Sequence, residues 1–216
     1  MGFVPAAFAF AAVVSASNTN NLFPTDHLLR PRADREALLR QRAVAVWLCG
    51  LSGSGKTTLG NALDRRLADA GFASMVLDGD NVRNGLNRGL GFSDDDRREN
   101  IRRVAEVSKL FVQAGVIVIN AFITPRRELR DLARDIVGQD DLLEVYVEAS
   151  FDTCARRDPK GLYAKAGTGA VPAFTGRDSA FEAPERCDLV LHTETETPAE
   201  SLERLWALVH PRVSVR

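Results

Sequence analysis

Short apolar runs alternate with amphipathic stretches along most of this chain. Each run is too short for a buried helix and rich enough in Val, Ile and Leu to predict a buried strand. These runs cover residues 43–49, 73–77, 116–119, 142–147 and 187–191. Between them, apolar residues recur every three or four positions, which predicts helices over about 59–70, 93–111, 126–137, 150–157 and 197–209.

The alternation of strands and helices predicts the fold class. No internal repeat accompanies it, so we expect an α/β protein with a doubly wound, mainly parallel sheet of five strands flanked by helices. Helix starts are marked by Ser93, by Ser150 and by the capping box 197–200, which has Pro at the first helical position. The carboxyl ends of parallel strands meet at one edge of a sheet, and ligands bind there.

Two segments break the pattern and define the expected organisation. Residues 158–183 are rich in glycine and carry Lys160, and a segment of this kind inside a compact domain is typical of a mobile lid. Residues 1–23 hold an Ala- and Phe-rich run that lacks the positive start of an export signal and is too short to span a membrane. We therefore expect a disordered leader over 1–23, a charged segment with a short helix over 24–42, and one domain over 43–210.

Composition narrows the class of partner. The 216 residues carry 28 basic and 29 acidic side chains, a formal charge of −1, which favours neither a nucleic-acid surface nor a basic membrane patch. The three cysteines are widely spaced, which argues against a disulfide framework and a zinc site. These features predict a cytoplasmic protein that acts on a small molecule.

The strongest motif follows the first strand. Residues 50–57 read GLSGSGKT, a complete phosphate loop in which glycines allow backbone N–H groups to converge on a phosphate. The lysine contributes a positive charge to the phosphates, and the hydroxyl after it can bind Mg²⁺. We therefore predict a nucleoside triphosphate site with Mg²⁺, formed by Gly50, Leu51, Ser52, Gly53, Ser54, Gly55, Lys56, Thr57 and Thr58.

Charged residues follow the second strand at the same predicted edge of the sheet. Asp78, Asp80 and Arg83 come directly after residues 73–77. If the extended conformation continues through residue 79, the two carboxylates lean to the same side. On the next helix, Arg97 and Asn100 extend the apolar stripe toward this edge, whereas the other arginines of that helix form ion pairs on a solvated face.

Five stretches together resemble the adenylyl-sulfate kinase family, also called APS kinases. They are GLSGSGKTTL (50–59), LDGDNVRNGLNRGLGFSDDDRRENIRRVAEV (77–107), AFITP (121–125), RDPKGLY (157–163) and FTGRDSAFEAPE (174–185). The resemblance runs from about residue 43 to about 210. It implies a phosphate-loop kinase fold and transfer of the ATP γ-phosphoryl group to the 3′-hydroxyl of adenosine 5′-phosphosulfate (APS), giving PAPS and ADP in sulfate activation.

The resemblance also implies roles for individual residues. Asp80 would be the base beside the accepting hydroxyl, with Lys56 as its catalytic partner, and Asp78 would lie near Mg²⁺ with Thr57, through water in the case of Asp78. The substrate-binding residues would be Asp80, Arg83, Phe92, Arg97, Asn100, Ile123, Thr124, Lys160 and Phe174, with Phe92 and Phe174 on the two faces of the adenine. A homodimer is implied as well, and docking of an ATP sulfurylase partner stays open.

This chain departs from the family at Thr124, where serine is usual, so a phosphoenzyme role there stays open. The residues alone leave two further alternatives. One is a kinase for a nucleoside monophosphate or a sugar acid, against which the aromatic pair and Arg97 argue. The other is a nucleotide-dependent switch that does not phosphorylate, against which Asp80 argues.

Overall fold

The computed structural model describes residues 25, 28–167, 175 and 181–215. Contacts divide the chain into two units, Met1–Arg30 and Pro31–Arg216, and the second contains every helix and strand named below. None of the helices in the described residues is long and apolar enough to cross a membrane.

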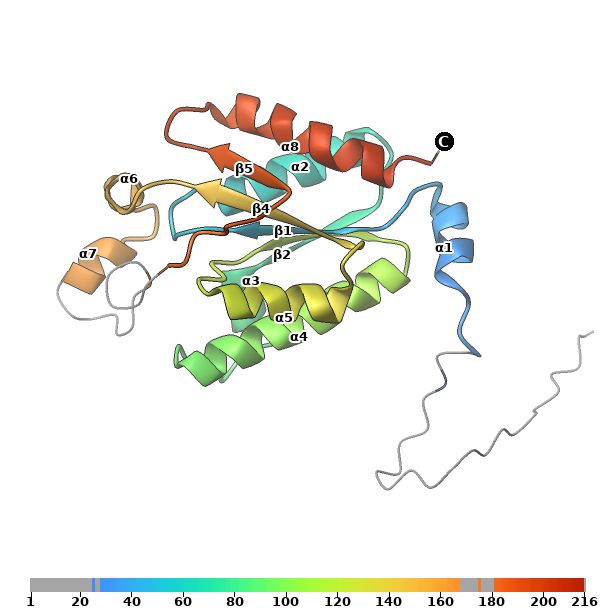
Figure 1. Ribbon diagram of the computed structural model, residues 1–216, viewed down its shortest axis with the longest axis horizontal. Helices are drawn as coiled ribbons and strands as arrows, with labels where there is room; N and C mark the ends of the chain where they lie inside the picture. Colours follow the sequence, from blue (N-terminus) through green and yellow to red (C-terminus); the bar gives the residue numbers. More distant parts are fainter. Residues whose placement is uncertain (1–24, 26–27, 168–174, 176–180, 216) are drawn as a thin grey trace, which may run out of the picture. The chain divides into compact units, whose positions relative to one another are not determined.

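Within the described residues, one five-stranded sheet forms the centre of the second unit (Figure 1). Its strands are β1 (Ala45–Cys49), β2 (Ser74–Asp78), β3 (Ile117–Ala121), β4 (Leu142–Glu148) and β5 (Leu189–His192). They pair in the order β2-β3-β1-β4-β5, and every pair is parallel. This arrangement confirms the predicted fold, and the parallel pairing brings all the carboxyl ends of the strands to one edge.

The helices cover both faces of the sheet, as Figure 1 shows. On one face, α2 (Lys56–Asp69) and α8 (Pro198–Val213) pack Leu59, Leu63, Leu205 and Val209 against the sheet. On the other face lie α3 (Gly79–Asn84), α4 (Asp94–Gln113) and α5 (Arg127–Val137). Successive residues of β1 point into opposite clusters, which explains why all five are buried and why the strand reads as a continuous apolar run.

Three short helices complete the described chain: α1 (Arg32–Leu39), α6 (Phe151–Arg157) and α7 (Leu162–Gly167). The predicted caps are present, because the side chains of Ser93, Ser150 and Thr197 each accept a bond from a backbone N–H in the first turn of α4, α6 and α8. The predicted ion pairs of α4, Arg103 with Glu99 and Arg102 with Glu106, also form.

The structure corrects three expectations. The chain is not extended through Gly79, because the Asp78 side chain caps α3, which begins there. The lid segment is not without regular structure, since α7 lies within it. The last helix does not end at Val209. It continues past Pro211 to Val213, whose side chain is fully buried in the core that α2 and α8 form with the sheet.

Candidate active site

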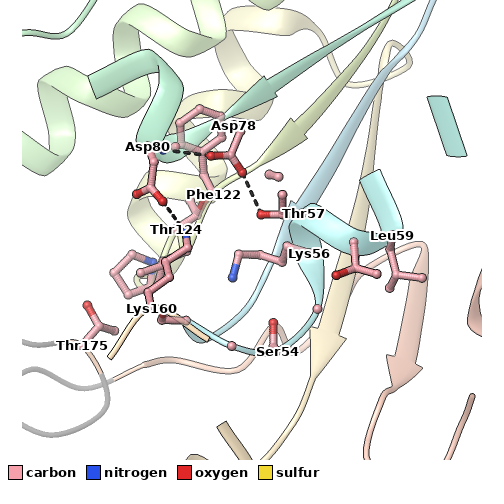
Figure 2. A pocket seen from close by; sticks show the side chains of 18 of the residues that line it. Ser54, Lys56, Thr57, Leu59, Asp78, Asp80, Phe122, Thr124, Lys160 and Thr175 are labelled. Carbon is pink, nitrogen blue, oxygen red and sulfur yellow. Dashed lines mark hydrogen bonds and ion pairs between the residues drawn. The ribbon is translucent and has the colours of Figure 1, made fainter. Parts of the chain in front are cut away.

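A cavity of about 950 Å³ opens at the carboxyl edge of the sheet. Its walls come from the phosphate loop, the ends of β2 and β3, the helices α3 and α4, the lid and the turn before α8. Figure 2 shows Lys56, Thr57, Asp78, Asp80 and Lys160 around one space. Of the predicted site residues, the cavity is lined by Ser52, Gly53, Ser54, Gly55, Lys56, Thr57, Thr58, Asp78, Asp80, Arg83, Phe92, Arg97, Asn100, Ile123, Thr124 and Lys160.

Three of the predicted site residues are not among the described residues that line the cavity. Gly50 and Leu51 do not line the cavity, but their backbone carbonyl oxygens accept hydrogen bonds from Lys56 Nζ. Phe174 lies outside the described residues.

The backbone conformation of the phosphate loop explains its glycines, as Gly50 and Gly55 illustrate. Gly50 has a φ of +148°, and a Cβ there would collide with the carbonyl oxygen of Val147 on β4. Gly55 has a φ of +107° and is the residue from which α2 starts. L-residues with a side chain rarely adopt these angles, so the motif glycines are required by the backbone conformation and not only by a phosphate.

Lys56 points into the cavity from the first turn of α2 (Figure 2). Its Nζ donates to the carbonyl oxygen of Gly50 at 2.9 Å and to that of Leu51 at 2.6 Å. The side chain is buried, and this burial lowers the Lys56 pKa to about 8. The ammonium group is therefore held by the loop itself, and a bound phosphate would compete with these carbonyl oxygens for it.

The carboxylate of Asp78 connects the phosphate loop to α3. Thr57 Oγ1 donates to Asp78 Oδ2 at 2.7 Å, and the backbone N–H of Asp80 donates to Asp78 Oδ1 at 3.0 Å. Both carboxylates face the cavity although the chain turns at Gly79, because the cap fixes Asp80 in the first turn of α3. The turn thus brings the carboxylates together by a different route from the extended strand that the sequence suggested.

Lys160, in the lid, forms an ion pair with Asp80. Both side chains are solvent-exposed. The lid is also joined to the phosphate loop, since Tyr163 of α7 donates its hydroxyl to the Ser52 carbonyl oxygen at 2.7 Å. These two bonds connect the lid with both the carboxylate and the phosphate-loop side of the cavity.

Two arginines hold the loop that carries Phe92. The Arg83 guanidinium lies over the Phe92 ring, 4.5 Å from its centroid, and donates to the Gly91 carbonyl oxygen at 2.8 Å. Arg97 donates to the Phe92 carbonyl oxygen at 2.9 Å and to Thr175 Oγ1 at 2.7 Å. Burial lowers the pKa of Arg83, and the nearby charge of Arg97 lowers it further. Two cations this close to each other favour an anionic ligand.

Thr124 lines the cavity with its hydroxyl engaged in the core. Its Oγ1 accepts a bond from the buried Trp47 Nε1 at 2.9 Å, and only 1% of the residue is exposed. Its φ is +41°, an uncommon value for a β-branched residue. Arg130 donates to the Thr124 carbonyl oxygen at 3.2 Å and pairs with the buried Glu144. The structure thus gives Thr124 a packing role, while its catalytic role stays a prediction.

Several residues of the cavity were not predicted. Arg157, Thr193, Glu196 and Pro198 form the wall behind the phosphate loop. Arg157 donates to Thr193 Oγ1 at 3.1 Å, and Thr193 Oγ1 donates to the Ser54 carbonyl oxygen at 2.8 Å. Only Arg157 carried a signal, because it lies next to the lid. Thr193 and Glu196 follow β5 in a turn with no motif, and the sequence marked Pro198 only as the first residue of the last helix.

Comparisons with known proteins agree with this geometry. The family model described as adenylylsulphate kinase matches residues 42–192. An adenylyl-sulfate kinase of Bacteroides fragilis is 51% identical over 195 residues, which cover 90% of this chain and 96% of that protein. A probable adenylyl-sulfate kinase of Halalkalibacterium halodurans is 50% identical, with 85% and 91% covered. The solved structure of the Mycobacterium tuberculosis APS kinase CysC in complex with AMPPNP and APS is 42% identical, with a TM-score of 0.75 and coverage of 78% and 98%.

Proposed function

The chain belongs to the adenylylsulphate kinase family, and we propose that its cavity transfers the γ-phosphoryl group of ATP to the 3′-hydroxyl of APS. The protein is an ATP-dependent kinase that phosphorylates APS. The observation that supports the site assignment best is the meeting of two halves in one cavity. Lys56 and Thr57 form the half suited to ATP, Arg83 and Phe92 form the half suited to an anionic adenine nucleotide, and Asp80 lines the same cavity.

Asp80 is the proposed general base. It would accept the proton of the 3′-hydroxyl as that oxygen forms a bond to the γ-phosphorus, while the bond between this phosphorus and the β,γ-bridging oxygen breaks and ADP leaves. The Asp80 backbone is fixed in the first turn of α3 by its bond to Asp78, and the Asp80 side chain lines the cavity. Lys56 and the loop N–H groups would neutralise the charge on the phosphates.

Mg²⁺ fits the pair formed by Thr57 and Asp78. The described residues hold no cluster of three His, Cys, Asp or Glu side chains that could bind a metal alone. Mg²⁺ in kinases, however, needs only one or two protein oxygens because phosphates and water fill its other positions. The Thr57 hydroxyl and the Asp78 carboxylate lie 2.7 Å apart and provide such oxygens. When bound, Mg²⁺ neutralises charge on the β- and γ-phosphates.

A coupled assay of ADP release tests the function directly. APS, AMP and gluconate are offered as acceptors with ATP and Mg²⁺, each at the same concentration. We expect release with APS far above the rate without an acceptor. Faster release with AMP or gluconate would identify a kinase for another metabolite, and ATP binding without release for any acceptor would identify a switch.

Lys160→Ala is expected to impair turnover more than ATP binding. Because Lys160 reaches Asp80 from the lid, its loss should disturb the assembled site and lower kcat by about 10- to 100-fold. The Kd for ATP, measured by calorimetry, should change by less than about threefold. Lys165→Ala is the matched control, since Lys165 lies on α7 and does not line the cavity. An equal loss of ATP affinity and turnover would make Lys160 a simple nucleotide ligand.

Phe92→Ala is expected to raise the KM for APS by about ten- to a hundredfold and to leave the KM for ATP unchanged. The Arg83 guanidinium already covers one face of the ring, so an adenine would stack on the opposite face. Leu86→Ala is the control, because Leu86 is exposed on the same connection between α3 and α4. An equal rise in the KM for ATP would contradict the assignment of Phe92 to the APS half of the cavity.

The assembly is proposed from the resemblance alone. A homodimer is the expected assembly, and light scattering of the purified chain would distinguish it from a monomer. Co-elution with an ATP sulfurylase would reveal that partner. A cytoplasmic location follows from the need for ATP.

A further inference from the structure

Asn87 is fully buried between α3 and α4, directly behind the cavity wall. Its side-chain Nδ2 donates to Asn100 Oδ1 at 2.9 Å and lies 3.4 Å from the Asn100 carbonyl oxygen. Asn100 lines the cavity and is itself only 4% exposed. Asn87 thus contacts a predicted acceptor-binding residue without lining the cavity.

The backbone fixes which way the Asn87 amide is turned. The Asn100 carbonyl oxygen is an acceptor, so the neighbouring Asn87 atom must be the NH₂ nitrogen and not the amide oxygen. Asn100 must then present its own Oδ1 to Asn87. Because the Asn100 carboxamide oxygen is taken up by Asn87, its NH₂ group is left to face other partners, and Asn100 lines the cavity.

Asn87 makes this contact at a cost. Its Oδ1 is buried and has no hydrogen-bond partner among the described residues. A buried acceptor without a partner is unfavourable, and an apolar side chain would avoid this penalty. Its backbone is also fixed, because the Asn87 N–H donates to the Val82 carbonyl oxygen at 2.9 Å at the end of α3.

We propose that Asn87 is a positioning residue for APS. Asn87 holds the Asn100 side-chain amide in the orientation in which the Asn100 NH₂ group donates to APS. The role of Asn100 rests on the proposed function, and Asn87 acts only through Asn100. The Asn100 NH₂ group would face oxygen atoms of the phosphosulfate or the ribose, which accept hydrogen bonds. If the Asn100 amide were turned the other way, its oxygen would face these oxygens and could not donate to them.

A double-mutant cycle tests the proposal. Asn87→Ala is expected to raise the KM for APS by about five- to tenfold, with the KM for ATP unchanged and kcat within about threefold, because it loses one buried hydrogen bond that orients a ligand. In the Asn100→Ala background, the same substitution should change the KM for APS by less than about twofold. Equal effects in both backgrounds would overturn the proposal.

Ser108→Ala separates positioning from stability. Ser108 is fully buried on α4, the helix that carries Asn100. Its hydroxyl donates to Asn120 Oδ1 at 3.0 Å, and neither residue lines the cavity. This variant should lower the Tm but leave the KM for APS unchanged. A rise in the KM equal to that of Asn87→Ala would show that any loosening of α4 has the same effect, and would also overturn the proposal.

The wild-type protein provides a measurement that needs no Asn87 variant. With ¹⁵N-labelled asparagine, the Asn100 NH₂ resonances, assigned with Asn100→Asp, should shift when APS is added. Unchanged resonances under saturating APS would refute the proposal even if Asn87→Ala does not fold. Failure of the proposed function is recognised separately, because the wild type would then release no ADP with APS.

Discussion

Asp80→Asn is expected to lower kcat by about 10²- to 10⁴-fold, the usual range for loss of a general base. Asparagine keeps the shape of the side chain and removes its basicity. The cap of α3 should survive, because it uses the Asp80 backbone N–H and the Asp78 carboxylate and not the Asp80 side chain. The loss should therefore fall on catalysis and not on folding.

Binding measurements on the same variant distinguish a base from a structural residue. Calorimetry should give ATP and APS affinities within about threefold of the wild type. Asp95→Asn is the matched control, since Asp95 is exposed in the first turn of α4 and does not line the cavity. Near-wild-type turnover of Asp80→Asn would remove Asp80 from the mechanism.

The ion pair between Lys160 and Asp80 offers a second explanation for a loss of rate in Asp80→Asn. Asp80→Asn also releases the lysine of the lid, so part of the lost rate could come from a displaced lid. In the Lys160→Ala background that contribution is already gone. If Asp80 is the base, Asp80→Asn should still cost at least about 10²-fold there. A much smaller loss would assign the effect to the ion pair.

The parts of the site predicted from the sequence are those in which neighbouring residues determine the geometry. The phosphate loop and its helix lie within one continuous stretch, and the angles at Gly50 and Gly55 explain why glycine occupies those positions. Arg97 and Asn100 followed from helical spacing, because α4 is long and regular. The strands followed from apolar runs, because both faces of the sheet are covered.

The parts that were missed depend on contacts between distant residues or on competing local signals. Thr193 reaches the Ser54 carbonyl oxygen from the end of β5, and no spacing in the sequence connects them. The helix that begins at Gly79 was missed because Asp, Gly and Asn suit both a turn at a strand end and a capped helix. Trp47 lies in the apolar run that forms β1, and no pattern in the sequence connects its indole N–H with the Thr124 hydroxyl to which it donates.

Lys56→Ala is expected to abolish measurable phosphoryl transfer, a loss of about 10³-fold or more, because charge neutralisation and positioning supply most of the catalysis in this chemistry. The fold should persist, since the hydrogen bonds of the ammonium group within the described part of the chain go to loop carbonyl oxygens and the side chain points into the cavity. Circular dichroism should keep its α-helical signal. Loss of that signal would show that Lys56 holds the fold together. Lys109→Ala controls for removal of a lysine, because Lys109 is exposed on α4.

The pH dependence of ATP binding gives an independent test of the same group. Burial lowers the Lys56 pKa to about 8, so the free protein loses this charge as the pH rises through that value. Bound phosphates favour the charged form and raise the pKa, so ATP binding above pH 8 should take up a proton. Affinity should fall by about tenfold between pH 7 and 9. Calorimetry in buffers of different ionisation enthalpy measures the proton directly. Lys56→Ala should bind ATP weakly with no proton uptake, and the same uptake in this variant would assign the titration to another group.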